Sequence, residues 1–228
     1  MTDTINRIIK YLRSRNLVPI LVIYFSVGVA GMVVPVTRNL FQSLTPFSLL
    51  ASLGLLLIHH GRFTRRFWIG AFIIFVAGIA VEAVGVTTGI LFGEYSYGDT
   101  LGPQVFHTPL MIGVNWLLLV YCSLSITDRY IDTPYFRAVT AAALMVVYDF
   151  ALEPAAIRLD MWSWAGGAVP LQNYLAWFII AFLLNSLAGR LGIFDRENKL
   201  AMPLFFIQMG FFIVLDLWIV IVALWDFS

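Results

Sequence analysis

Three carboxylic acids lie in stretches of the sequence that are otherwise apolar: Glu82, Asp149 and Glu153. An acid inside hydrocarbon costs several kcal/mol, so such residues are candidates for function by default. Asp149 and Glu153 are four residues apart and therefore share one face of a helix. A structural hydrogen bond to a Trp or Tyr of a neighbouring helix is the other explanation for this pair. In the functional interpretation, these acids transfer a proton to an apolar substrate.

Glycines accompany the first of these acids. Gly78, Gly85 and Gly89 recur at helical spacing around Glu82 and share its face. Small residues let neighbouring helices approach closely, which explains the glycines by packing alone. With an acid on the same face, a cleft for a slim apolar ligand is the better interpretation.

Further polar and aromatic residues are expected to line one pocket with the three acids. They are Tyr95, Tyr97, His107, Asn115, Trp116, Trp162, Trp164, Asn173, Tyr174, Trp177 and Asp216. Tyr and Trp also gather where a membrane meets water, which is the alternative for the pairs at 95 and 97 and at 162 and 164. Asp216 has the alternative of a satisfied polar group in the last helix. His107 is either a proton donor or an interfacial residue.

The elements that must position these residues are membrane-spanning helices. The chain is 61% hydrophobic and 12% charged, whereas a soluble domain is ~45–50% apolar and ~25% charged. Several apolar runs reach the ~20 residues that a spanning helix needs. We expect an all-α, polytopic membrane protein with one integral membrane domain over residues 1–228. Its seven transmembrane helices are predicted at about 17–36, 41–58, 67–91, 105–126, 135–152, 171–188 and 202–225. The fifth should stop at Glu153-Pro154, because the residue before proline leaves the helical region.

The basic residues predict the orientation of this seven-helix bundle. With the N-terminus cytoplasmic, twelve of the 14 Lys and Arg residues lie on the inner side, and only Arg38 and Arg158 lie outside. Inner loops carry such an excess of positive charge. Residues 1–16 predict a short amphipathic, basic helix on an anionic membrane surface. We expect a multi-pass protein of the cell (inner) membrane. The topology places the three acids in the half of that membrane that faces away from the cytoplasm.

Several classes of chemistry lack their usual residues. The sequence lacks the histidine clusters that iron-dependent membrane hydroxylases and desaturases use, its single cysteine is Cys122, and no Gly-rich phosphate loop follows a strand pattern. The only lysines, Lys10 and Lys199, lie outside the spans, so a retinal Schiff base cannot form. The net charge of +1 does not suggest a nucleic-acid partner. We therefore expect no metal and no cofactor, and chemistry that carboxylic acids perform alone.

The middle of the chain, residues 82–177, resembles the carotenoid biosynthesis membrane proteins that hydrate acyclic carotenoid ends. This family includes the 1′-hydratases of monocyclic carotenoids and the bacterioruberin-type hydratases. The resemblance rests on E-A-V-G-V-T-T-G-I-L-F-G-E-Y-S-Y-G from Glu82, L-G-P from Leu101 and T-P-L-M-I-G-V-N-W from Thr108. It continues with D-F-A-L-E-P from Asp149, W-S-W from Trp162 and V-P-L-Q-N-Y-L-A-W from Val169. Glu153 stands where related sequences often have Asp.

The resemblance implies addition of water across the terminal C=C of an acyclic carotenoid such as lycopene, γ-carotene or a C50 type. An acid must protonate the alkene to a tertiary carbocation, and burial keeps a carboxyl group protonated near neutral pH. Our hypothesis makes Glu82 the proton donor and lets Asp149 or Glu153 hold the water. Trp164, Trp177 and Tyr97 would then line the cation site. The donor and the base can be exchanged without conflict with the sequence.

Two other functions fit the same residues. A lycopene cyclase also protonates an acyclic end, but its product gains no water. A non-catalytic carotenoid-binding or transport protein would keep its pigment after loss of the carboxylates. In each case we expect an apolar carotenoid and the lipid bilayer as partners, together with other membrane enzymes of the carotenoid pathway, and no nucleic acid.

Overall fold

The computed structural model is an all-α bundle with two short β-ribbons. It describes residues 7, 11–13 and 15–225. The helices are α2 (Val18–Val33), α3 (Pro35–Ser43), α4 (Thr45–Ile58), α5 (Arg65–Thr88), α6 (Leu110–Thr127), α7 (Pro134–Arg158), α8 (Leu171–Leu191) and α9 (Ala201–Trp225). Of the expected basic lead, Arg7 and residues 11–13 are helical, and the remainder up to residue 10 lies outside the described residues.

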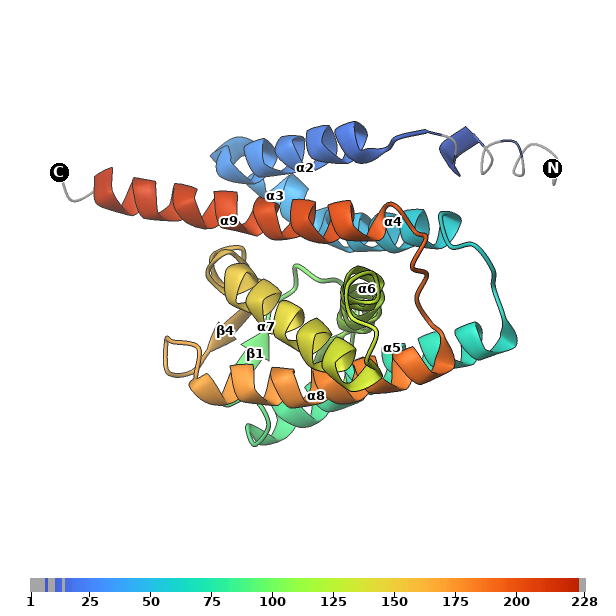
Figure 1. The fold of residues 1–228 in the computed structure, drawn as a ribbon. Helices are drawn as coiled ribbons and strands as arrows, with labels where there is room; N and C mark the ends of the chain where they lie inside the picture. Colours follow the sequence, from blue (N-terminus) through green and yellow to red (C-terminus); the bar gives the residue numbers. More distant parts are fainter. Residues whose placement is uncertain (1–6, 8–10, 14, 226–228) are drawn as a thin grey trace.

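Helix α6 is the central element of the bundle. In Figure 1 it is seen end-on, with α5, α7 and α8 on one side and α4 and α9 on the other. Of its apolar stretch, 83% is buried inside the protein, against 17–39% for the other long helices. Its neighbours therefore shield α6 from lipid, and their own outer faces remain apolar and exposed. This is the arrangement expected of a bundle with hydrocarbon around it.

The chain is a multi-pass membrane protein. Five described helices, α5 to α9, are long and apolar enough to cross a bilayer, and α3 with α4 makes a sixth if that pair is one span bent by 52°. Helix α2 has 16 residues, or about 24 Å at about 1.5 Å per residue, which falls short of a hydrocarbon core of about 30 Å. The seventh span and the cytoplasmic N-terminus stay predictions.

Predicted helix boundaries are wrong at three places. The predicted helices 17–36 and 41–58 leave residues 37–40 as a loop, but α3 covers that stretch. Helix α7 continues to Arg158 with Pro154 inside it, although proline removes one helix hydrogen bond. In a bundle, neighbouring groups compensate for that loss. The predicted fourth helix began at 105, but α6 begins at Leu110 after the hairpin of β2 (Gln104–Val105) and β3 (Thr108–Pro109). Phe106 and His107 form its two-residue turn, both with positive φ, as a type I′ turn requires.

Local signals determine where α5, the helix that carries Glu82, begins and ends. The Thr64 hydroxyl accepts a hydrogen bond from the Phe67 N–H at 3.1 Å, which caps the first turn. Gly89 ends the helix in the left-handed conformation, with φ of 66°. The chain then turns back, so that residues 95–97 return to the level of Glu82.

Close packing of α5 against α6 gives a first testable prediction. A Cβ atom at Gly113 of α6 would lie 2.7 Å from the backbone oxygen of Phe75. We expect Gly113→Ala to lower the free energy of unfolding by about 1–3 kcal/mol, because a backbone atom cannot move aside cheaply. Thermal denaturation of the detergent-solubilised protein measures the loss.

The matched control is Gly54→Ala in α4, where an added Cβ meets nothing within 4 Å among the described residues. That variant should be at least as stable as the starting protein, since alanine favours helix. Equal stability of the two variants would contradict the α5–α6 packing.

Candidate active site

A two-stranded ribbon covers one side of the acids. Strand β1 (Tyr95–Tyr97) pairs antiparallel with β4 (Trp162–Trp164), so Tyr95 lies opposite Trp164 and Tyr97 opposite Trp162. Between these pairs, the hydroxyls of Ser96 and Ser163 lie 3.2 Å apart on the exposed face. Side chains alternate along a strand, so all four aromatic residues lie on the face opposite the serines. The ribbon thereby turns four polar aromatic tips toward the bundle.

Glu82 receives three hydrogen bonds. Its Oε2 accepts from the hydroxyls of Tyr95 at 2.6 Å and Tyr97 at 2.8 Å. Its Oε1 accepts from the indole N–H of Trp116 on α6 at 3.1 Å. Glu82 is 3% exposed. Every contact comes from a donor, which is the environment that a buried carboxylate needs.

The two tyrosines are donors over the ordinary pH range. Burial, and secondly the charge of Glu82, raise the pKa of both Tyr95 and Tyr97 above its usual value. A phenol in this setting therefore keeps its proton. Hydrogen bonds to an ionised acceptor are short and about twice as strong as neutral ones, which agrees with the short Tyr95–Glu82 distance.

Glu153 is held by the other strand of the ribbon. Its Oε2 accepts from the indole N–H groups of Trp162 and Trp164, each at 3.0 Å. An indole N–H is a donor only, so this oxygen acts as an acceptor from both. The two tryptophans are therefore hydrogen-bond donors to an acid and not simply members of an interfacial belt.

Asp149 lies one turn before Glu153 on α7 and is the least exposed of the three acids, at 1%. Its Oδ2 accepts from the side-chain amide of Asn173 on α8 at 2.9 Å. No other hydrogen bond to its side chain occurs among the described residues. Its second oxygen is consequently available to a substrate or a water molecule.

The three acids line one small polar cavity of about 30 Å³. That volume suits a water molecule, and its polar partners are present. Trp116 and Trp177 both belong to its wall and stack directly on each other, with ring centroids 4.2 Å apart. Its lining comprises Glu82, Tyr95, Tyr97, Ile112, Asn115, Trp116, Asp149, Leu152, Glu153, Trp162, Trp164, Asn173 and Trp177. Eleven of these are sequence candidates, now in one place.

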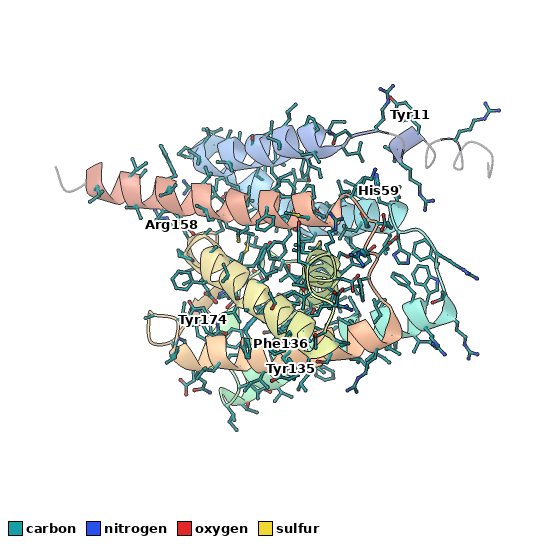
Figure 2. All side chains as sticks on the ribbon, in the orientation of Figure 1. Tyr11, His59, Tyr135, Phe136, Arg158 and Tyr174 are labelled. Atoms are coloured by element: carbon teal, nitrogen blue, oxygen red, sulfur yellow. The ribbon has the colours of Figure 1, made fainter. Side chains whose placement is uncertain are left out.

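Three sequence candidates lie elsewhere. His107 is exposed in the turn between β2 and β3. Tyr174 packs its ring on Phe150 at 5.7 Å between α7 and α8, as its position in Figure 2 shows. Asp216 on α9 lies beside the backbone of Ala155, next to the interior proline of α7. None of the three lines the cavity.

Sequence reasoning missed Ile112 and Leu152, the apolar residues of the lining, and it missed the ribbon. Nothing in the sequence marks Ile112 and Leu152 as lining residues, because they resemble any apolar residue of a spanning helix. The ribbon had a signal: Y-S-Y and W-S-W each alternate aromatic and polar residues with the period of a strand.

A separate polar cluster lies outside the lining of this cavity. His60 is buried and its Nδ1 lies 3.0 Å from the Tyr121 hydroxyl, which also accepts from Asn198 at 2.8 Å. His59 lies at the end of α4 (Figure 2) and does not line the cavity of the acids. Across the described part of the chain, no three His, Cys, Asp or Glu side chains are placed to hold a metal ion.

Comparison with known proteins identifies the family. Residues 43–226 match the family described as carotenoid biosynthesis protein. The chain belongs to this family. The match contains the whole cavity lining and begins after α2 and nearly all of α3.

One curated relative is the bisanhydrobacterioruberin hydratase of Haloarcula japonica, which is 33% identical over 112 residues. The alignment covers 43% of this chain and 36% of the relative, so the chain matches about a third of the relative's length. No solved structure matches the chain.

The contact between β1 and Glu82 in this family member gives a second prediction. Tyr97→Phe removes one charge-assisted donor and should lower the free energy of unfolding by about 1.5–3 kcal/mol. In a Glu82→Gln background the same change should cost clearly less, because the charged acceptor is gone. A double-mutant cycle in detergent measures the coupling.

Ser96→Ala, on the outward face of the same strand, is the control and should stay within about 0.5 kcal/mol. An equal cost of Tyr97→Phe in both backgrounds would show that the hydroxyl does not act on Glu82.

Proposed function

We propose that this protein is a carotenoid hydratase, an enzyme that adds water to the terminal C=C of an acyclic carotenoid. The observation that carries the proposal is the water-sized cavity lined by three carboxyl groups and by aromatic side chains. Membership of the carotenoid biosynthesis family and the similarity to a hydratase support the substrate class and the reaction.

The reaction needs two carboxyl groups in different protonation states. One donates a proton to the alkene carbon C2, which leaves a tertiary cation at C1. A water oxygen bonds to C1, and its proton passes to a carboxylate. Proton transfer between the two carboxyl groups then restores the starting state, so the net change is the addition of one water.

The hydrogen bonds favour Asp149 as the donor and Glu82 as the ion, which exchanges the roles of our sequence hypothesis. Glu82 is surrounded by three donors, and each stabilises negative charge on it. Asp149 meets only the Asn173 amide and has one oxygen without a protein partner among the described residues. Glu153, one turn away on the same helix, is placed to receive the proton of the water and return it to Asp149.

Aromatic faces supply stabilisation for the cation. The stacked indoles of Trp116 and Trp177 border the cavity, and Tyr95 lies 5.0 Å from Trp164 between ring centroids. A cation over such a ring is stabilised by about 0.5–2 kcal/mol, more for Trp than for other rings. Together with the negative charge of Glu82, this lowers the barrier to protonation.

Product analysis with isotope exchange tests the function and the roles together. The protein is produced in a host that makes lycopene and γ-carotene, and membranes are incubated in D₂O. The unmodified protein should yield alcohols heavier by one water molecule. Asp149→Asn and Glu82→Gln should each lower the yield by about 100-fold or more.

Deuterium in the unreacted carotenoid separates the two roles. Without a proton donor no cation forms, so Asp149→Asn should leave the carotenoid free of deuterium. Without the base, a slowly formed cation returns to alkene by losing a proton to the Asp149 carboxylate, so the carotenoid recovered from Glu153→Gln should contain some deuterium. Asp216→Asn, outside the cavity, is the control with normal turnover. Products without added water would indicate a cyclase, and normal turnover in Asp149→Asn would overturn the assignment.

A further inference from the structure

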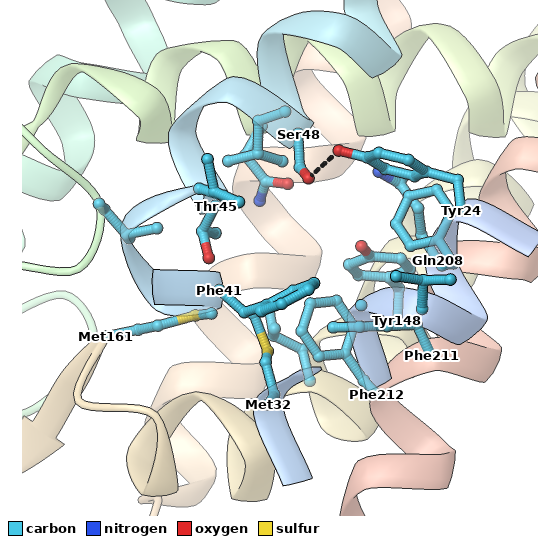
Figure 3. A pocket seen from close by; sticks show the side chains of 18 of the residues that line it. Tyr24, Met32, Phe41, Thr45, Ser48, Tyr148, Met161, Gln208, Phe211 and Phe212 are labelled. Carbon is cyan, nitrogen blue, oxygen red and sulfur yellow. Dashed lines mark hydrogen bonds between the residues drawn. The ribbon is translucent and has the colours of Figure 1, made fainter. Parts of the chain in front are cut away.

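A second, larger cavity of about 150 Å³ lies beside the polar one. Helices α2, α3, α4, α7 and α9 and the loop residues around 101 and 161 contribute to its wall. Figure 3 shows the rings of Phe41, Tyr148, Phe211 and Phe212 and the sulfur of Met32 around this space. The lining is almost entirely apolar, so the cavity suits a hydrocarbon chain.

The two cavities are neighbours through common walls. Ile112 and Asn115 of α6, Leu152 of α7 and Trp162 of β4 line both. A linear molecule in the apolar cavity therefore has one end next to the acids. Asn115 lies at this junction, and its side chain has no hydrogen-bond partner recorded among the described residues.

The apolar cavity reaches the lipid-facing surface of the bundle. Tyr24 and Val27 of α2 and Leu44 between α3 and α4 line it, and they are 46%, 53% and 41% exposed. In a membrane these side chains meet acyl chains. An apolar substrate dissolved in the bilayer can thus enter sideways, without crossing water.

One wall of the apolar cavity carries an unpaired polar atom. Gln208 of α9 is 4% exposed, and its Nε2 donates to the Ser52 hydroxyl at 3.3 Å. Among the described residues, no donor reaches its Oε1. The Thr45 hydroxyl, which is also in this lining, has no hydrogen-bond partner among them either. A buried acceptor without a donor costs about 1–3 kcal/mol. A ligand with a hydroxyl group would supply the donor.

We infer that the apolar cavity binds the isoprenoid chain next to the reacting end, and that Gln208 is a specificity residue which accepts a hydrogen bond from a hydroxyl on that chain. This inference rests on the proposed function for the position of the reacting end. The substrate class is then an acyclic carotenoid that already carries a hydroxyl group near its end. Part of the wall, including Gly28 and Met32, comes from residues before the family match, which begins at residue 43. The accepted chain is therefore selected partly by a segment that the family match does not contain.

Two neighbouring leucines of α4 provide a matched test of the cavity. Leu49 lines it, whereas Leu50 is 46% exposed and does not. Leu49→Trp should fill the space, reduce the carotenoid that copurifies at least tenfold and raise KM. Leu50→Trp should leave both the amount of copurifying carotenoid and the KM unchanged.

If Leu49→Trp does not fold, Val27→Trp at the mouth replaces it, with Ile23→Trp on the exposed side of α2 as its control. Unchanged pigment and KM in the cavity-lining variant would overturn the site.

Substrate discrimination tests Gln208. Two acyclic carotenoids with the same reacting end are compared, one a hydrocarbon and one with a hydroxyl a few bonds from that end. The unmodified protein should have kcat/KM about tenfold higher for the hydroxylated one, the value of one hydrogen bond. Gln208→Leu should equalise the two substrates while the protein still hydrates the hydrocarbon. Unchanged discrimination would mean that water satisfies Gln208, which overturns its role.

The same assays separate this inference from the proposed function. If Asp149→Asn abolishes hydration and Leu49→Trp changes nothing, the function holds and the chain site is wrong. Suppose that neither the unmodified protein nor any variant hydrates the carotenoid, but pigment is lost only from Leu49→Trp. The chain site then holds and the hydratase proposal is wrong. An unmodified protein that neither retains pigment nor hydrates overturns both.

Discussion

The structure depends on providing hydrogen-bond donors to acids that are buried away from bulk water. Helices in a bilayer use their own backbone groups internally, so the donors for Glu82 and Glu153 have to be side chains. The β1–β4 ribbon supplies four of them, two hydroxyls and two indole N–H groups. Aromatic residues suit this position because each combines a large apolar body with one polar tip. The bundle thus keeps its acids without exposing them.

Composition and hydrophobic runs predicted the fold class correctly, and most helices lie within a few residues of their predicted bounds. Two boundaries failed for physical reasons. Pro154 signals a helix end locally, but tertiary packing carries α7 past it to Arg158. The run from 105 is apolar, but the I′ turn at Phe106 and His107 makes a hairpin there. Helix α2 ends at Val33, three residues before the predicted end of its apolar run.

The candidate site was predictable to the extent that its residues are polar or aromatic in an apolar setting. Glu82, Asp149 and Glu153 stand out for that reason, and the structure brings them to one cavity. Which of the candidate donors bonds to which acid was not predictable, because pairing β1 with β4 joins segments 67 residues apart. Ile112, Leu152 and the whole apolar cavity left no mark in the sequence, since hydrocarbon walls look like ordinary packing. Asp216 and His107 were included for their chemistry alone, and their positions separate them from the others.

The strict alternation in β1 and β4 makes the environment of two acids depend on one strand register. A slip of β1 by a single residue against β4 would turn both tyrosines outward and Ser96 inward, and a slip of β4 would do the same to both tryptophans and Ser163. In either case one acid, Glu82 or Glu153, would lose all of its ribbon donors at once. Segments on either side of α6 and α7 must therefore meet in a single register before both acids are accommodated.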